Sequence, residues 1–384
     1  MNESVKILFG LIGGLALFLY GMNSMSDALQ KAAGEKMKKI LGFLTKNPVM
    51  GALAGALVTA VLQSSSATTV MTIGFVSANL MTLPQAISVI FGANIGTTMT
   101  AQLMAFKITD YIYPIIFAGF MMNFICKNEK MKNIGLAIFS FGLLFEGIEI
   151  MGTVMKPLAT APFFLEMMDK VKDIPVLGVI LGAGMTLVVQ SSSATIAVLQ
   201  NFASQAGADG VHSVIGLTGA IPILLGDNIG TTITAVLASF GGTVPAKRAA
   251  FFHVLFNVVG SLLFMIVLSP FTLLIEWLAG ALNILPELQL SVAHGIFNVV
   301  TTAFFFPLIP AIVKLIKKIL PSSKKEINMD LSELDQNVVQ LFPSHALAIA
   351  KNKIIEMGHI TIEAVEGIRA YFETKNPLAK VSRI

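Results

Sequence analysis

Apolar residues dominate the first 320 positions of the chain and gather in long stretches that short polar segments separate. A helix needs about 20 apolar residues to cross the hydrocarbon core of a bilayer. On this basis we predict membrane-spanning helices over residues 5–26, 112–126, 133–155, 249–268 and 291–313. The second of these stretches is short and needs its neighbouring residues to complete a span.

Two further apolar stretches, residues 49–62 and 176–189, each end where a polar run begins. A helix of that length is too short to cross a core about 30 Å thick. We therefore predict that each forms the first arm of a re-entrant hairpin whose tip carries the polar run. Short, glycine-interrupted segments at equivalent places in two halves of a chain are typical of the midplane site of a transporter.

The chain contains two copies of one pattern. Gln63-Ser-Ser-Ser-Ala-Thr-Thr69 recurs as Gln190-Ser-Ser-Ser-Ala-Thr-Ile196. Gly92-Ala-Asn-Ile-Gly-Thr-Thr98 recurs as Gly226-Asp-Asn-Ile-Gly-Thr-Thr232. The second pair of segments is slightly further apart than the first, and a small insertion near residues 207–213 accounts for the difference. We call the first two segments the serine runs and the last two the asparagine motifs.

Lysine and arginine are enriched in cytoplasmic loops, so their positions predict the orientation of each repeat. Five lysines between residues 31 and 46 place that segment inside the cell, whereas acids accompany the lysines of residues 166–173. The two repeats are therefore predicted to be inverted in the bilayer. Lysines between residues 314 and 325 put the C-terminus inside. This organisation predicts repeat one over about 5–126, repeat two over about 133–268 and a final span over about 291–313.

Composition supports a membrane protein. Charged residues make up 12% of the chain and hydrophobic residues 55%, with a mean hydropathy of +0.79. So few charges cannot cover the surface of a soluble fold of this size. The net charge of +4 is small and scattered, which argues against nucleic-acid binding. The single cysteine, Cys126, excludes an intrachain disulfide and a cysteine-based metal cluster.

The serine runs have the chemistry of an oxyanion site. Residues 47–106 contain no acidic, basic or histidine side chain, and residues 174–246 contain no Lys or Arg. A ligand would therefore meet hydroxyls, amides and backbone groups. Helices that restart after each tip would add backbone N–H groups and partial positive charge. The candidate contacts of this oxyanion are Ser64, Ser65, Ser66, Ser191, Ser192 and Ser193.

An anion bound in this way lacks compensating charge, because two helix ends supply only about one positive charge. We therefore expect a cation to bind with it. The asparagine motifs offer neutral oxygens beside what we predict is a glycine-broken helix, and such oxygens suit an alkali cation. These oxygens belong to Asn94, Thr97, Thr98, Thr100, Asn228, Thr231, Thr232 and Thr234. Sodium coupling is the first hypothesis and proton coupling its rival.

One carboxylate breaks the equivalence of the two motifs. Asp227 stands where repeat one has Ala93, so it is a candidate cation ligand or proton carrier. The patterns His253-x-x-x-Asn257 and His294-x-x-x-Asn298 are interpreted as structural. A serine hydrolase is disfavoured, since neither serine run has a His or Lys base in its own segment, and the sequence predicts no enzyme.

The paired serine runs, each followed by an asparagine motif, resemble the type II sodium/phosphate cotransporter family, including its bacterial branch. The resemblance covers about residues 5–313. It implies phosphate as substrate, sodium as coupling ion and a site built from both hairpin tips. The serines then contact phosphate. Together with the oxygen set above, the resemblance places sodium near Gln63, Asn94, Thr97, Gln190, Ser191, Asp227, Asn228, Thr231 and Thr234.

The composition changes after Pro321 to that of a soluble segment. Apolar residues there follow three- and four-residue spacing, which predicts an amphipathic helix. The segment resembles the opening of a PhoU-like domain of bacterial family members. We therefore expect a transport domain over 1–320 and an incomplete, cytoplasmic helical tail over 321–384, from a truncated chain or a helix that docks on another chain.

The leading hypothesis is an all-α polytopic protein of the cell inner membrane, with two inverted repeats that each hold a re-entrant hairpin and a broken helix. It would transport inorganic phosphate with sodium by alternating access and need no cofactor. The alternatives are a proton-coupled carrier, a transporter or exporter of another oxyanion, an exporter of phosphate, and a membrane phosphate sensor. Whether the chain forms a homodimer is left open by the sequence.

Overall fold

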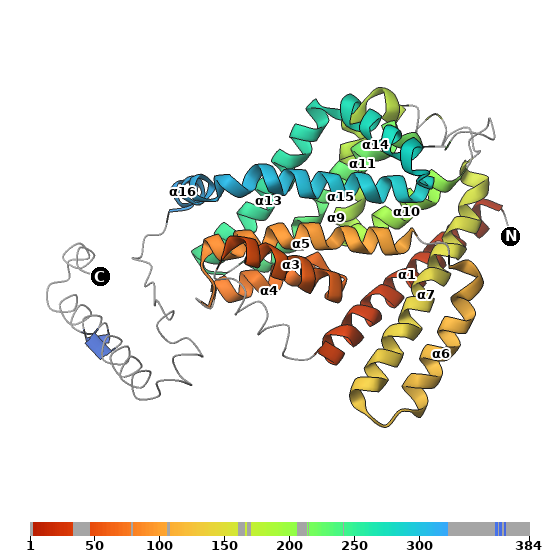
Figure 1. The fold of residues 1–384 in the computed structure, drawn as a ribbon, viewed down its shortest axis with the longest axis horizontal. Helices are drawn as coiled ribbons and strands as arrows, with labels where there is room; N and C mark the ends of the chain where they lie inside the picture. Colours follow the sequence, from red (N-terminus) through yellow and green to blue (C-terminus); the bar gives the residue numbers. More distant parts are fainter. Residues whose placement is uncertain are drawn as a thin grey trace. The chain divides into compact units, whose positions relative to one another are not determined.

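A computed structural model describes residues 3–33, 47–77, 80–105, 108–159, 170–205, 215–240 and 242–321, together with residues 166, 213, 358, 359, 361, 362 and 365. The elements in these ranges are helices (Figure 1). The chain divides into two compact units, Met1–Ile319 and Leu320–Ile384. Most of the predicted tail, and the lysines at 34–46, lie outside the described residues.

Five helical segments of the described residues are long and apolar enough to cross a membrane. They are Val5–Ala32, Glu129–Val154, Gly216–Ser239, Val244–Ile266 and Pro286–Ile319. Four of them contain most of a predicted span. The stretch predicted at 112–126 forms helix α6, Ile112–Ile125, which is shorter than these five. The segment Gly216–Ser239 was not predicted as a span, because the second asparagine motif interrupts its apolar pattern.

The two repeats have the same order of elements. In repeat one, α1 (Glu3–Ala33) precedes α3 (Pro48–Leu62), α4 (Ser65–Ser77), α5 (Leu83–Met104), the short η1 (Thr109–Tyr111) and α6. In repeat two, α7 (Glu129–Ala159) precedes α9 (Pro175–Val189), α10 (Ser192–Ser204), α11 (Gly216–Thr231), α12 (Ile233–Ser239) and α13 (Val244–Ile266). Helices α14 (Leu268–Leu282), α15 (Pro286–Phe305), η2 (Phe306–Leu308) and α16 (Ile309–Ile319) follow the second repeat.

The prediction that glycine breaks the helix in each asparagine motif is wrong for repeat one. Helix α5 runs through Gly92 and Gly96 without interruption. In repeat two the helix is interrupted at Thr232, beyond both glycines, where α11 ends and α12 begins. The glycines have a packing role instead, because each lies where no side chain fits.

Glycines bring α3 against α5, and α9 against α11, in the same register. A Cβ atom added to Gly55 would collide with the backbone carbonyl of Val89, and one added to Gly182 would collide with that of Ile223. The motif glycines are equally close to the opposite helix, since a Cβ atom on Gly96 or Gly230 would lie 2.6 Å from a carbonyl oxygen. Small residues at membrane-helix interfaces allow such backbone contact. The helices that carry the serine runs and the asparagine motifs are therefore held in matching positions in the two repeats.

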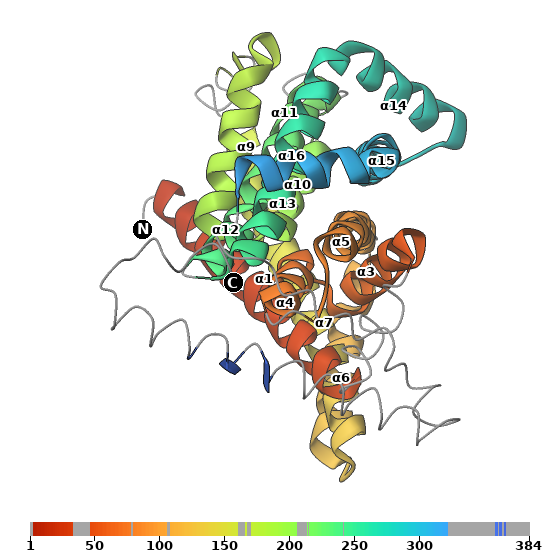
Figure 2. The ribbon, with the colours of Figure 1, turned by 90° about the vertical axis from the view of Figure 1, so that its left-hand side faces the viewer.

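The last helix of each repeat packs differently. Helix α6 packs along α7, whereas its counterpart α13 packs against α4, α5 and α11. A cluster of phenylalanines supports the α5–α13 contact: the Phe91 ring centroid lies 5.2 Å from that of Phe252 and 5.3 Å from that of Phe256. The two repeats therefore share helix order but not a common set of neighbours (Figures 1 and 2).

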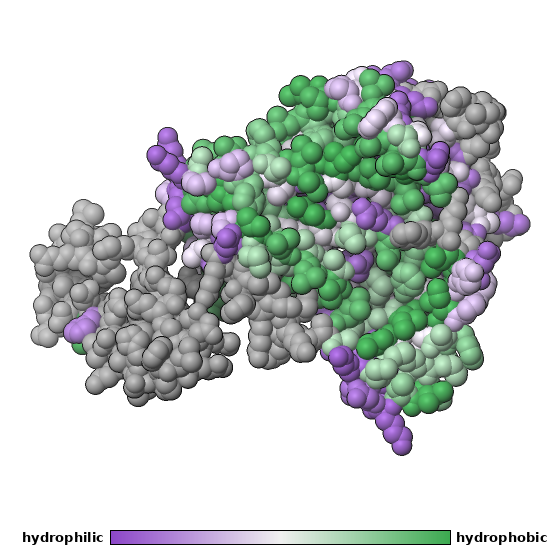
Figure 3. Space-filling view, viewed as in Figure 1, coloured by the Kyte–Doolittle hydropathy of each residue, from purple (hydrophilic) through white to green (hydrophobic). Residues whose placement is uncertain are grey.

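Many large apolar side chains remain exposed on the outer faces of the helices. Leu57, Phe117, Ile180 and Ile266 are examples, and each exposes about half of its surface or more. In the space-filling view, apolar residues cover much of the visible helical face (Figure 3). Apolar surface of this extent is unusual for a soluble monomer and suits contact with lipid tails.

Candidate functional site

Each serine run begins at a strained turn. Helices α3 and α9 end at Gln63 and Gln190, and both residues adopt the left-handed conformation with φ of 54°. A residue with a Cβ atom pays about 1 kcal/mol or more in this region, which glycine usually occupies. The same strained turn occurs at equivalent positions in the two repeats. Helices α4 and α10 begin immediately after it.

The first serine of each run caps the helix that follows. Ser64 Oγ accepts a hydrogen bond from the Ala67 amide at 3.1 Å, and Ser191 Oγ accepts one from the Ala194 amide at 3.3 Å. A serine that accepts in this way can still donate its O–H, and Ser191 Oγ donates to Met22 Sδ at 3.8 Å. The next residues, Ser65 and Ser192, open α4 and α10, so both runs lie at helix N-termini, where backbone N–H groups favour an anion.

A pair of threonine hydroxyls joins the two helices around each turn. Thr59 Oγ1 donates to Thr68 Oγ1 at 2.9 Å, and the equivalent atoms of Thr186 and Thr195 lie 2.8 Å apart. These four threonines are buried. Sequence reasoning did not assign them to the site, although the second pair occupies the same positions relative to its serine run as the first. They hold the arms of each helix pair at a fixed separation directly behind the serine run.

Asp227 lies behind the second turn. Its side chain is fully buried, and its Oδ1 accepts a hydrogen bond of 2.5 Å from Thr186 Oγ1. Its Oδ2 has no hydrogen-bond partner among the described residues. A carboxylate in such surroundings is costly unless a cation or a proton neutralises it. In repeat one Ala93 takes this place, so the first turn has no counterpart of this carboxyl group.

We expect Thr186→Val to destabilise the protein more than Thr59→Val does. Both variants lose one threonine pair, but only the first removes the hydroxyl that donates to the buried Asp227 carboxyl. The extra loss should be about 1 to 3 kcal/mol. Thermal unfolding of the two purified variants in the same detergent measures the difference. Equal unfolding temperatures would show that the Thr186–Asp227 hydrogen bond contributes nothing.

The asparagine motifs repeat their hydrogen bonds as well. The Nδ2 atoms of Asn94 and Asn228 each donate at 2.8 Å to the carbonyl one turn earlier, that of Ile90 and of Leu224. Because Nδ2 is used in this way, each Oδ1 points away from its own helix as an acceptor. Thr231 Oγ1 donates to the backbone carbonyl of Asp227, one helical turn earlier, at 2.9 Å.

One contact connects the serine run of repeat one to the motif region of repeat two. Thr234 Oγ1, on α12, donates to Ser66 Oγ, on α4, at 3.2 Å. Residues 168 positions apart are therefore neighbours, as a site built from both repeats requires. Thr100, the counterpart of Thr234, is buried, and its Oγ1 has no hydrogen-bond partner among the described residues.

The remaining predicted ligand residues differ in their burial and in their hydrogen bonds. Gln63 donates from Nε2 to the Ala60 carbonyl, and its buried Oε1 finds no partner in the described part of the chain. Its counterpart Gln190 is exposed. Ser193 and Thr97 are buried. Among the described residues no direct hydrogen bond joins the two serine runs, so the structure does not itself bring all the predicted ligands into one shell.

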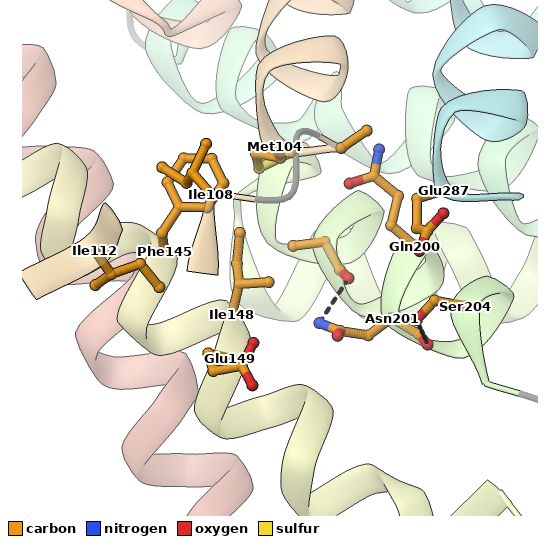
Figure 4. Close-up of a pocket in the computed structure, with 12 residues that line it drawn as sticks. Met104, Ile108, Ile112, Phe145, Ile148, Glu149, Gln200, Asn201, Ser204 and Glu287 are labelled. Carbon is orange, nitrogen blue, oxygen red and sulfur yellow. Dashed lines mark hydrogen bonds between the residues drawn. The ribbon is translucent and has the colours of Figure 1, made fainter. Parts of the chain in front are cut away.

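A cavity of about 150 Å³ lies at the opposite end of α10 from the serine run. Gln200, Asn201 and Glu287 are among the polar residues that line it, and Phe145 and Ile148 are among the apolar ones (Figure 4). None of the six candidate serines lines this cavity. It is therefore distinct from the turns that carry the serine runs.

The chain matches known proteins over most of its length. Residues 17–153 and 154–281 match, one after the other, a family described as Na+/Pi-cotransporter. "Uncharacterized protein YqeW" of Bacillus subtilis is 32% identical over 318 residues, 82% of this chain and 99% of that protein. "Putative inorganic phosphate export protein YjbB" of Escherichia coli (strain K12) is 25% identical over 368 residues, and the chain spans 64% of its length.

A shorter match is to human "Sodium-dependent phosphate transport protein 2B", which is 34% identical over 105 residues, 27% of this chain and 15% of that protein. No solved structure matches the chain. The two consecutive matches confirm the predicted duplication, and they agree with the repeated turns, hydrogen bonds and glycine contacts described above.

Proposed function

The chain belongs to the Na+/Pi-cotransporter family, a family of membrane transporters and not of enzymes, and on this premise we propose that it is a secondary-active, sodium-coupled transporter of inorganic phosphate. Membership makes it a multi-pass membrane protein with phosphate as transported substrate. The observation that carries the proposal is the pair of equivalent turns, each with a capping serine in front of a new helix and a threonine pair behind.

We propose that the two turns are the tips of re-entrant hairpins in inverted repeats. Helices α3 and α9 have 15 residues each, a length of about 22 Å, which is less than the hydrocarbon core. Irregular backbone at that depth is tolerated when it lines a cavity or is buried in protein. Alternating access would expose the two tips to opposite sides in turn.

Phosphate would bind where the N-termini of α4 and α10 meet the six serine hydroxyls. Sodium would bind behind them, with Asp227 as its charged ligand in repeat two. The fully buried carboxylate, with one oxygen that has no partner among the described residues, supports a cation at this place. The further proposed sodium ligands are Gln63, Asn94, Thr97, Gln190, Ser191, Thr231 and Thr234. Asn228, which the sequence also predicts as a ligand, has its Oδ1 3.2 Å from His294 Nε2.

Phosphate uptake into proteoliposomes tests the proposal. Radiolabelled phosphate should accumulate under an inward sodium gradient and should not under an equal potassium gradient. A second set of vesicles with a pH gradient and no sodium tests proton coupling. Uptake that is indifferent to both gradients would remove the coupling, and the absence of any phosphate flux or binding would remove the function.

We expect Ser65→Ala and Ser192→Ala each to weaken phosphate binding by about tenfold or more, the value of a hydrogen bond to a charged ligand. The matched controls are Ser77→Ala and Ser204→Ala, which change the serines at the far ends of the same helices α4 and α10. Phosphate titration of the purified proteins measures the effect. Wild-type affinity in both tip variants would move the phosphate site elsewhere.

Export is a second candidate direction, because the name of YjbB gives phosphate export. Vesicles loaded with phosphate distinguish the two directions: efflux that an outward sodium gradient drives shows only reversibility, whereas efflux with sodium absent favours an exporter. A cytoplasmic C-terminus, a PhoU-like tail and a homodimer also remain proposals. The distribution of lysines and the spacing of apolar residues in the tail support the first two.

A further inference from the structure

Helix α15 lies outside both repeats and beyond residue 281, where the second family match ends. It packs against α5, α10, α11 and α13, and so it touches helices of both repeats (Figures 1 and 2). The buried side of this helix combines apolar residues with polar ones that are at least nine-tenths buried, among them Ser291, His294, Asn298, Thr301 and Thr302. Burial of polar groups inside a membrane protein costs free energy unless they have partners or a function.

Two of these residues contact the repeats directly. Ser291 Oγ donates to the Ala101 carbonyl of α5 at 2.9 Å, and Gln200 of α10 donates to Ser291 Oγ at 2.8 Å. His294 Nε2 lies 3.2 Å from Oδ1 of Asn228, in the second asparagine motif. Helix α15 therefore connects a backbone carbonyl of α5 to a motif side chain of α11.

The chemistry of Asn228 determines the direction of its hydrogen bond to His294. Asn228 Nδ2 already donates to the Leu224 carbonyl at 2.8 Å, so Oδ1 is the acceptor that faces the imidazole. His294 must then donate, with its proton on Nε2. His294 Nδ1 is buried and has no hydrogen-bond partner among the described residues, so this one bond accounts for the orientation of the ring.

Repeat one has no equivalent of this bond. Asn94 makes the same hydrogen bond to its own helix, from Nδ2 to the Ile90 carbonyl at 2.8 Å. Within the described ranges, no donor reaches Asn94 Oδ1. The two motif amides are therefore alike in sequence and rotamer but differ in the availability of the oxygen that a hard cation would use.

We propose that His294 is a positioning residue whose Nε2–H occupies one of the two acceptor sites of Asn228 Oδ1, which makes this oxygen a poorer cation ligand than Asn94 Oδ1 and so makes the two motifs unequal. Repeat two then binds sodium through Asp227 and neighbouring hydroxyls, whereas repeat one keeps Asn94 Oδ1 as a ligand. The inference rests on the proposed sodium coupling. It assigns to α15, which lies outside the duplicated unit, control over the sodium affinity of repeat two.

Binding of ²²Na+ to purified protein tests this inference without transport. Loss of the donor in His294→Leu should free Asn228 Oδ1 and lower the half-saturating sodium concentration about threefold to tenfold, the value of one hydrogen bond. His294→Gln keeps an N–H donor and should bind sodium like the wild type. The double variant with Asn228→Ala removes the freed ligand and should return the affinity to that of the wild type.

A second comparison keeps the inference testable if His294→Leu does not fold. In the wild-type background, Asn228→Ala should change the half-saturating sodium concentration less than twofold, whereas Asn94→Ala should raise it about tenfold. Equal effects of the two alanine variants, or an unchanged affinity in folded His294→Leu, would overturn the role of His294. A wild-type protein that binds phosphate but no sodium would overturn the proposed coupling instead.

Discussion

Asp227→Asn should reduce sodium-driven phosphate uptake by about 100-fold or more, the loss expected when one partner of a buried charged pair is removed. The carboxylate is fully buried behind the second turn and receives one hydrogen bond, from Thr186. An asparagine keeps the volume but removes the negative charge that would hold the cation. Initial rates of uptake into proteoliposomes, measured across a series of sodium concentrations, test this expectation.

The matched control is Asp110→Asn, which makes the same chemical change at an exposed position in η1. It should leave uptake near the wild-type rate. Gel filtration of both proteins separates a lost function from a lost fold. Sodium dependence that stays unchanged in folded Asp227→Asn would exclude this carboxylate as the charged ligand, and the neutral motif oxygens would then have to bind the ion alone.

We expect Gly182→Ala to lower the unfolding temperature by about 2 °C or more, because overpacking a close contact typically costs about 1 to 3 kcal/mol. The added methyl group would collide with the Ile223 carbonyl and would lie 2.9 Å from the Asp227 amide nitrogen. The variant should therefore also weaken phosphate uptake, since α11 must shift and carry Asp227 with it. Thermal unfolding in detergent and uptake by the same preparation measure both effects.

Gly184→Ala is the matched control in the same helix. Nothing lies within 4 Å of a Cβ atom added there, and alanine is a better helix former than glycine by about 1 kcal/mol. This variant should be as stable as the wild type or more so. If both alanine variants unfold at the same temperature, the contact between α9 and α11 is looser than the structure indicates.

The duplication and most long helices could be predicted from the sequence, because a duplication appears as repeated motifs and a membrane-spanning helix as a long apolar stretch. The recurrence of the serine run and of the asparagine motif identifies equivalent positions before any contact is known. Those positions share backbone angles at Gln63 and Gln190 and share threonine pairs. Local chemistry was sufficient here, since each of these features depends on residues close together in the chain.

Other features could not be predicted, because they depend on contacts between helices that are far apart in the sequence. Glycines in a polar motif predict a break in the helix as long as the helix that packs against them is unknown. Gly92 and Gly96 lie in an unbroken α5, where they allow its close contact with α3. The pattern His294-x-x-x-Asn298 was interpreted as structural, since nothing in the sequence shows that His294 faces Asn228. The contact between Ser66 and Thr234 likewise joins segments that the duplication does not relate.

The Ser66–Thr234 contact also indicates where the protein has mechanical freedom. Helices α3 and α5, and helices α9 and α11, meet at glycines in backbone contact, so neither pair can slide without separating. Helix α4 packs against α12, and between them Thr234 Oγ1 donates to Ser66 Oγ in a hydrogen bond of 3.2 Å, worth about 1 kcal/mol. A hydroxyl can exchange such a partner for water or for a ligand oxygen at little cost. The first serine run can therefore move at this one contact, although the packed side chains of α13 hold α4 and α5 in place.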